Sequence, residues 1–201
     1  MKPVIGIVLF VVLLLGVLPI VLRQAETSAQ ALVPAQGSPS DSPQSTALPA
    51  EAKPAAPRGP IAPEIVSDTW LNSVPLTQGD LRGKVRVVEF WTFDCINCRN
   101  TIPQVRNWYD KYHNQGLVVI GVHSPELSFE YDLSNVKNAI KDLNIQYSVA
   151  IDNDFKNWNA YHVRAWPTVF ILDKQGAIRF THVGEGAYAE AEQTIASLLK
   201  E

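Results

Sequence analysis

Cysteine is scarce in this sequence: among 201 residues there are two, Cys95 and Cys98. A secreted domain that depends on disulfides has several spaced cysteine pairs, so that class is excluded. A structural zinc site needs four ligands, but a second cysteine pair is missing and the four histidines lack paired spacing. A structural disulfide across so short a loop would add little stability. The fold must therefore depend on a hydrophobic core, which leaves both thiols available for chemistry.

An excess of basic residues is also missing. The chain has 17 Lys and Arg against 20 Asp and Glu, a net charge of −3, and from residue 64 onward the counts are 13 and 17. Nucleic-acid-binding domains carry a basic patch or stripe. We therefore expect no nucleic-acid partner.

Charge is absent altogether from residues 4–22, which are almost wholly aliphatic. About 20 residues of helix span the ~30 Å hydrocarbon core of a bilayer, whereas the apolar core of a signal peptide has ~7–15 residues. We therefore predict a single-pass membrane anchor, a signal-anchor helix, over residues 1–23. The alternative is a signal peptide that is cleaved at the Ala-Gln-Ala sequence of residues 29–31.

Aromatic residues are absent from residues 24–63, a segment that holds 8 of the 14 prolines. Such a composition cannot bury enough surface to offset its ordering entropy, so we predict a flexible, disordered linker. Residues 64–201 have the length of one domain. Lys2 and Arg23 lie on opposite sides of the apolar segment and give no orientation. The N-terminal apolar segment is of the kind that directs export, and the domain that follows it carries a cysteine pair suited to disulfide chemistry. We therefore expect the domain on the extracytoplasmic (periplasmic) side of the cell membrane.

Strand patterns alternate with helix patterns in residues 64–201. Helices are predicted from the cysteines to about residue 114, over residues 133–143 and at the C-terminus. Strands are predicted over residues 85–92, 117–122 and 147–151, and a hairpin over residues 168–172 and 177–183. This order is typical of an α/β sandwich with a mixed central sheet.

The order strand, Cys-x-x-Cys, helix carries the chemistry. Cys95 would lie at the start of a helix, where unpaired N–H groups and the helix dipole favour a thiolate. Only the thiolate attacks a disulfide. Cys98, one turn further along, would then resolve the mixed disulfide. The pair predicts a thiol–disulfide oxidoreductase that uses its own redox-active disulfide and needs no metal or other cofactor.

Residues 87–98 (VVEFWTFDCINC) resemble the active-site strand and motif of the thioredoxin superfamily. Pro103 matches the helix-kinking proline of thioredoxins, and Trp166-Pro167 matches their cis-proline loop. The chain is similar to membrane-linked redoxins of the TlpA and ResA kind. It is still more similar to the redoxin domain of DipZ-type proteins, which share the segments GVHSPE and DNDF. The resemblance covers about residues 85–199 and implies a thioredoxin-like three-layer sandwich.

The resemblance implies roles for individual residues. Cys95 would be the nucleophile and Cys98 the resolving thiol. Glu89 would be a buried acid with a raised pKa that exchanges a proton with Cys98; the alternative is a solvated strand residue.

Two tryptophans and a proline are the candidate substrate-binding residues. Pro167 would present the backbone of Trp166 to a substrate chain, and an X–Pro bond is the common cis site. Trp91 lies four residues before Cys95. We favour packing beneath the site over substrate contact for Trp91.

Three further residues are candidates for tuning the cysteines. Asp94 stands where thioredoxins usually have tryptophan, and an anion beside a thiol raises its pKa, although Arg99 would partly offset this. The direction of electron flow therefore stays open. His123 and Glu126 follow a parallel strand, at the sheet edge where sites form. For His123 we favour a hydrogen-bonded loop residue over a tuning role.

Asp152 and Asp154, in the DNDF segment, have the residue type and position of turn and helix-cap residues. We therefore expect them to have a structural role.

The resemblance implies disulfide-bearing protein substrates, a membrane electron donor of the DsbD or CcdA type, and cytochrome c maturation as a pathway. A thiol peroxidase is the first alternative, since Thr92 and Cys95 form a Thr-x-x-Cys motif, although Val88 replaces the proline of that motif. A copper-binding chaperone of the Sco type is the second. Its cysteines are one residue further apart and are joined by a histidine.

Overall fold

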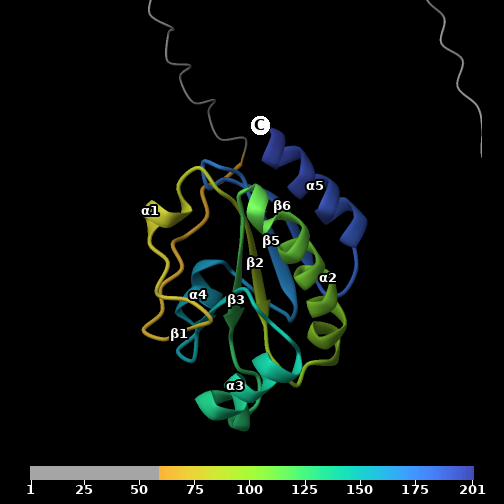
Figure 1. Ribbon diagram of the computed structural model, residues 1–201. Helices are drawn as coiled ribbons and strands as arrows, with labels where there is room; N and C mark the ends of the chain where they lie inside the picture. Colours follow the sequence, from red (N-terminus) through yellow and green to blue (C-terminus); the bar gives the residue numbers. More distant parts are fainter. Residues whose placement is uncertain (1–58) are drawn as a thin grey trace, which may run out of the picture. The chain divides into compact units, whose positions relative to one another are not determined.

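A computed structural model describes residues 59–201 (Figure 1). The predicted membrane anchor and most of the predicted linker lie outside these residues. Within the described part, no helix combines the length and apolar character that crossing a membrane requires.

One mixed sheet of six strands forms the centre of the fold, in the order β1-β4-β3-β2-β5-β6. The parallel strands β2, β3 and β4 lie side by side, and β1, β5 and β6 run antiparallel to their neighbours. The strands are β1 (Trp70–Leu71), β2 (Val85–Trp91), β3 (Leu117–His123), β4 (Ser148–Ile151), β5 (Thr168–Leu172) and β6 (Ile178–Val183). The mixed sheet is confirmed.

Helices cover both faces of this sheet, as Figure 1 shows for α2 and α5 on one side and α1 and α4 on the other. The helices are α1 (Gln78–Leu81), α2 (Ile96–Tyr112), α3 (Leu133–Asp142), α4 (Lys156–Ala160) and α5 (Tyr188–Lys200), and the 3-10 turns are η1 (His113–Gln115) and η2 (Ser128–Tyr131). The helices and strands predicted from the pattern are present. The short elements β1, α1, η2 and α4 were not predicted.

Two apolar clusters, one on each face, hold the layers together. Ile102 of α2 and Ile195 of α5 pack with Val87 on one face, and Leu81 of α1 packs with Phe90 on the other. Side chains alternate between the faces of a strand, so the odd-numbered residues of β2 point toward α2. All of β2 is buried.

The fold begins a few residues before Glu64. The backbone N–H of Ala62 donates to the carbonyl of Gly176 at 2.9 Å, and Ile61 forms a β-bridge with Ala177. A Cβ on Gly59 would collide with the carbonyl oxygen of Ile178. Composition had placed residues 59–63 in the linker, but hydrogen bonds to the β5–β6 turn make them part of the domain.

Candidate active site

Cys95 and Cys98 lie where β2 gives way to α2. Cys95 is the residue before the helix. Its carbonyl accepts a hydrogen bond from the N–H of Arg99 at 3.1 Å, and this bond forms the first turn of α2. Both cysteines are free thiols; Cys95 is partly exposed and Cys98 is fully buried. A substrate disulfide can therefore reach Cys95 but not Cys98.

The environment of Cys98 keeps its thiol protonated. Burial raises the pKa of Cys98 far above its ordinary value, although a hydrogen bond from the backbone of Thr92 acts in the opposite direction. Negative charge on Cys95 and on Glu89 raises this pKa further. Because Cys98 does not ionise unaided, its attack on a mixed disulfide requires a base.

Glu89 lies in β2 and is fully buried, which rules out the solvated alternative. Its Oε2 accepts a hydrogen bond from the hydroxyl of Tyr147 at 3.0 Å, and its Oε1 has no partner within residues 59–201. Burial raises the pKa of Glu89 to about 8, even though the Tyr147 hydroxyl lowers it. A carboxyl group with this pKa, close enough to Cys98 to perturb its ionisation, can exchange a proton with it near neutral pH.

Trp91 packs beneath the site, as favoured from the sequence. Its indole is fully buried in the cluster that contains Cys98, and it meets the ring of His123 edge-on at 5.1 Å. A Cβ on Gly121 would lie 2.8 Å from the indole nitrogen, so glycine is needed beside it. A buried indole cannot contact a substrate, so packing is confirmed for Trp91, and its candidacy as a substrate-binding residue is wrong.

The Trp166–Pro167 peptide bond is cis. Trp166 and Cys95 are both partly buried and pack against the same core cluster. The indole N–H of Trp166 donates to the carbonyl of Ser124 at 2.9 Å, and its ring packs on Trp158 at a centroid distance of 4.2 Å. These contacts fix the loop that the resemblance assigns to substrate binding.

Asp152 caps α4, as expected. Its carboxylate accepts hydrogen bonds from the backbone N–H groups of Asn157 at 2.9 Å and Trp158 at 3.0 Å. Asp154, in the same turn, accepts a hydrogen bond from the N–H of Lys156 and pairs with its ammonium group. The turn residues therefore have the structural role that the sequence indicates.

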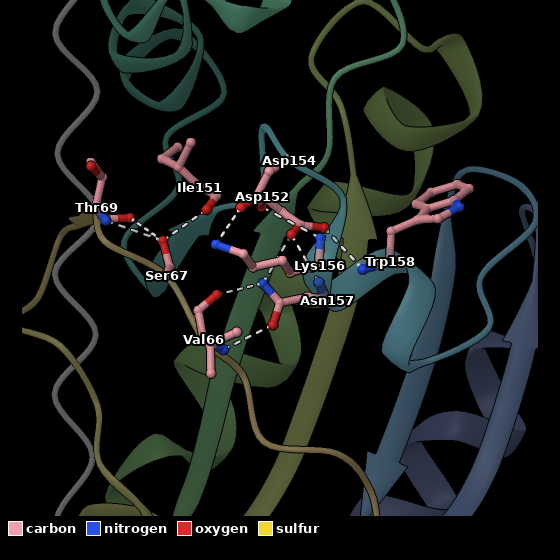
Figure 2. Close-up of polar contacts among 9 residues, drawn as sticks. All are labelled: Val66, Ser67, Thr69, Ile151, Asp152, Asp154, Lys156, Asn157 and Trp158. Atoms are coloured by element: carbon pink, nitrogen blue, oxygen red, sulfur yellow. Dashed lines mark hydrogen bonds and ion pairs between the residues drawn. The ribbon is translucent and has the colours of Figure 1, made fainter.

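Figure 2 shows that Asp152 also joins this turn to its surroundings. The side-chain amide of Asn157 bonds to Asp152 at 3.0 Å and to the carbonyl of Val66 at 2.7 Å. On the other side, Asp152 accepts the hydroxyl of Ser124, the residue whose carbonyl holds Trp166. The cis-proline loop is thus linked through a buried carboxylate to the segment before β1.

His123 is the last residue of β3 and is fully buried. Its Nε2 lies 3.5 Å from the hydroxyl of Thr92, its Nδ1 has no partner within residues 59–201, and its ring stacks on Phe93 at 5.7 Å. The favoured interpretation, a fully hydrogen-bonded loop histidine, is therefore wrong. Burial lowers the pKa of His123 to about 4, so the ring is neutral near pH 7.

Glu130, in η2, is a buried carboxylate that the sequence did not reveal. It accepts backbone hydrogen bonds from Asp94 at 3.0 Å and from Glu126 and Leu127 at 2.7 Å, and it also interacts with the hydroxyl of Thr92. Burial acts to raise the pKa of Glu130, but these hydrogen bonds outweigh it and hold the pKa below its ordinary value.

The side chain of Glu126 is exposed, and only its backbone N–H joins the network of Glu130. The carboxylate that reaches the cysteine loop is therefore Glu130, and the prediction for Glu126 is corrected. A serine or threonine three residues before Glu130 would have indicated a capping box, but this position is Leu127.

Asp94 has an exposed side chain. Arg99 donates to the carbonyl of Phe93 at 3.3 Å, and the ion pairs among residues 59–201 do not include Arg99 with Asp94. The expected compensation between these two charges therefore does not take the form of an ion pair.

Comparison with known proteins identifies the family. Residues 61–181 match the model of the AhpC/TSA family. The chain belongs to this family. This AhpC/TSA chain is 40% identical over 144 residues to Protein DipZ of Mycobacterium tuberculosis, a match that covers 70% of this chain and 21% of DipZ. It is 31% identical over 134 residues to thiol-disulfide oxidoreductase ResA of Bacillus cereus, which covers 67% of this chain and 74% of ResA.

Solved structures agree with this assignment. A thiol-disulfide isomerase from Corynebacterium glutamicum aligns with a TM-score of 0.63 and 26% identity over 72% of this chain and 98% of its own. A thioredoxin-like protein in its oxidised form aligns with a TM-score of 0.63 and 27% identity over 70% of this chain and 95% of its own. The thioredoxin-like fold is confirmed, and the described domain of this AhpC/TSA chain is a redoxin of the thiol–disulfide oxidoreductase kind.

Proposed function

We propose that the whole protein is a membrane-anchored thiol–disulfide oxidoreductase that exchanges disulfides with extracytoplasmic proteins. The observation that carries this proposal is the unequal pair of thiols. Cys95 is partly exposed at a helix N-terminus, and Cys98 is buried with Glu89 close enough to affect its ionisation. One thiol can meet a substrate, and the other has a base to activate it.

In the first step, the thiolate of Cys95 attacks one sulfur of a substrate disulfide. A bond forms between Cys95 and that sulfur, the substrate S–S bond breaks, and the other substrate sulfur leaves as a thiolate that takes a proton from solvent. Trp166, which packs against the same core cluster as Cys95, and the adjoining Pro167 would position the substrate backbone.

In the second step, the thiol of Cys98 gives its proton to the ionised carboxylate of Glu89 and attacks the sulfur of Cys95. The Cys95–Cys98 disulfide forms, the bond between Cys95 and the substrate breaks, and the second substrate sulfur leaves. Two electrons pass from the dithiol to the substrate. The proton on Glu89 returns to solvent or to Cys98 when the pair is reduced again.

Reduction of the Cys95–Cys98 disulfide requires a dithiol donor, and we propose a membrane protein of the DsbD or CcdA type. An anchor at residues 1–23 and a flexible linker at residues 24–63 would keep the domain close to such a donor on the periplasmic side. Cytochrome c maturation is the pathway we propose, with support from the similarity to redoxins of the ResA kind.

Membership of the AhpC/TSA family does not by itself separate disulfide exchange from peroxide reduction. The hydroxyl of Thr92 contacts His123 and Glu130, and within residues 59–201 it makes no hydrogen bond to Cys95. Disulfide exchange therefore fits the site better than the Thr-x-x-Cys chemistry of a peroxidase. Among the same residues, no three His, Cys, Asp or Glu side chains converge on a metal position, so copper binding is supported by no observation.

Trapping tests the proposal. In cells that produce the full chain, Cys98→Ser should accumulate mixed disulfides with partner proteins, identified by mass spectrometry after non-reducing electrophoresis. Cys95→Ser is the matched control and should trap none, because the attacking sulfur is lost. Exported partners are expected. Cytoplasmic partners would contradict the location, and no trapped protein together with normal peroxide turnover would contradict the activity.

A further inference from the structure

A second charged site lies at the end of the sheet opposite the cysteines, where β2 begins and the β5–β6 turn reverses the chain. A pocket of about 390 Å³ opens there. Its charged lining residues are Arg82, Arg86 and Lys174, its polar ones are Gln78 and Gln175, and it has no carboxylate among its lining residues.

Arg86 is the unusual member of this set. It lies within the apolar run of β2 and is 8% exposed. Its Nε has no hydrogen-bond partner within residues 59–201, and the ion pairs of this part of the chain do not include it. Burial lowers the pKa of this guanidinium group. A buried charge without a partner is costly in free energy. An anionic ligand that pairs with Arg86 would remove this cost, which favours its binding.

The neighbouring carboxylate of Asp173 does not serve as that partner. Asp173 is close enough for its charge to raise the pKa of Arg86. However, its Oδ1 accepts the N–H groups of Gln175 at 3.0 Å and Ala177 at 2.9 Å, and its Oδ2 pairs with Arg179 at 3.3 Å. Both carboxylate oxygens of Asp173 therefore already have partners, in the turn and on Arg179.

The turn is shaped to leave space for the guanidinium group. Gly176 has a φ of +86°, and a Cβ at this position would lie 3.2 Å from Nη2 of Arg86. Lys174 donates one ammonium hydrogen to the carbonyl of Leu199 at 3.2 Å. An ammonium group has three hydrogens, so two remain for a ligand in the pocket, and Arg82 is exposed at its rim.

We propose that this pocket binds a phosphate group, with Arg86 as its principal ligand and Arg82 and Lys174 as supporting cations. A guanidinium group presents a planar fork that matches two phosphate oxygens. Three cations and two side-chain amides suit a dianion. Two sources supply this chemistry, a lipid headgroup and a soluble phosphate, and the lipid source rests on the membrane anchor proposed above.

Thermal unfolding of the full chain in detergent micelles tests the site with inorganic phosphate. The melting temperature should rise saturably with phosphate but not with potassium chloride of equal ionic strength. Arg86→Met should fold, because it replaces an unpaired buried charge with an apolar side chain, and should weaken phosphate binding by about tenfold or more. Arg82→Gln and Lys174→Gln should each weaken it less, and Lys137→Gln, on the exposed surface of α3, should not change it.

Mixed micelles separate the two sources. If the ligand is a headgroup, dioleoylphosphatidylglycerol should stabilise the parent protein but not Arg86→Met, and dioleoylglycerol, which lacks the phosphate, should stabilise neither. Saturable binding of inorganic phosphate alone would support the soluble source. If neither probe stabilises the parent protein, or if Arg86→Met responds as the parent does, the phosphate site is overturned.

Discussion

Glu130 and Asp94 are 36 residues apart in the chain and are joined by a hydrogen bond of 3.0 Å from the backbone N–H of Asp94 to the Glu130 carboxylate. Asp94 directly precedes Cys95, so this hydrogen bond fixes the backbone next to the residue that carries the reactive sulfur. The same carboxylate holds the backbone of Glu126 and Leu127. One buried anion therefore connects the cysteine loop to η2.

Replacing this anion should weaken both the fold and the site. In Glu130→Gln, the amide NH₂ would face backbone N–H donors that the carboxylate now accepts. We expect the free energy of unfolding to fall by about 2–4 kcal/mol and disulfide reduction to slow, because the backbone before Cys95 loses its anchor. Urea denaturation and an insulin-reduction assay measure the two effects.

Glu126→Gln is the matched control, since its side chain is exposed and four residues away. It should change stability by no more than ~0.5 kcal/mol. Equal effects of the two substitutions would show that Glu130 has no special position.

Glu89→Gln should slow the resolving step by about 100-fold, because a general base contributes on that order. In the parent protein, the rate of this step should rise with pH through about 8, as Glu89 ionises. The variant should lose this dependence. Stopped-flow fluorescence of a single turnover from pH 6 to 9, roughly the range in which such a base titrates, follows the step.

Tyr147→Phe provides the accompanying test for Glu89. The Tyr147 hydroxyl lowers the pKa of Glu89, so its removal should move the midpoint of the pH dependence upward. A midpoint that stays in place in Tyr147→Phe, or a pH dependence that survives in Glu89→Gln, would show that another group accepts the proton.

The raised pKa of Glu89 should also make stability depend on pH. Between 4.5, its ordinary value, and about 8, its value in the fold, the folded protein keeps a proton that the unfolded chain releases. Stability should therefore fall as pH rises through this window, by at most about 5 kcal/mol, and the Glu89 contribution should be constant outside it.

Denaturation of the parent and of Glu89→Gln across that window gives the test. The variant should lack the decline, and His123 and the other shared groups cancel in the difference between the two curves. Parallel curves would mean that Glu89 titrates alike in the folded and unfolded states.

Gly121→Ala should disturb the core beneath the cysteines. The new Cβ would lie 2.8 Å from the indole nitrogen of Trp91 and 3.1 Å from Cε2 of Tyr147. Overpacking of this kind costs about 1–3 kcal/mol, which thermal denaturation can measure. In contrast, Gly79→Ala meets only the hydroxyl of Thr77 at 3.4 Å and should stabilise the protein by ~0.4–1 kcal/mol. The reverse order would refute the packing argument.

The sequence predicted those parts of the fold whose signals are local. Continuous apolar runs mark β2 and β3, and the Cys-x-x-Cys spacing together with the following amphipathic pattern locates Cys95 at the start of α2. β1 escaped prediction because a two-residue strand has no detectable period. α1 and α4 have 4 and 5 residues, which are also too few for a helical pattern.

The supporting residues of the site could not be predicted in the same way. Glu130 acts on Asp94, 36 residues away, and its choice over Glu126 depends on which side chain η2 turns inward. Arg86 lies in a run that otherwise reads as a buried strand, and only the three-dimensional surroundings show that its charge lacks a partner.

The segment before β1 is bound to the domain at both ends. Ile61 forms a β-bridge with Ala177, and the backbone of Val66 is hydrogen-bonded to the side chain of Asn157, which supports the cis-proline loop through Asp152 and Ser124. A protease that cuts ahead of Gly59 would therefore release a domain that keeps these contacts together with Cys95 and Cys98. A cut after Leu71 would remove β1 and the hydrogen bonds between Val66 and Asn157, so the remaining domain would lose one support of the Trp166–Pro167 loop.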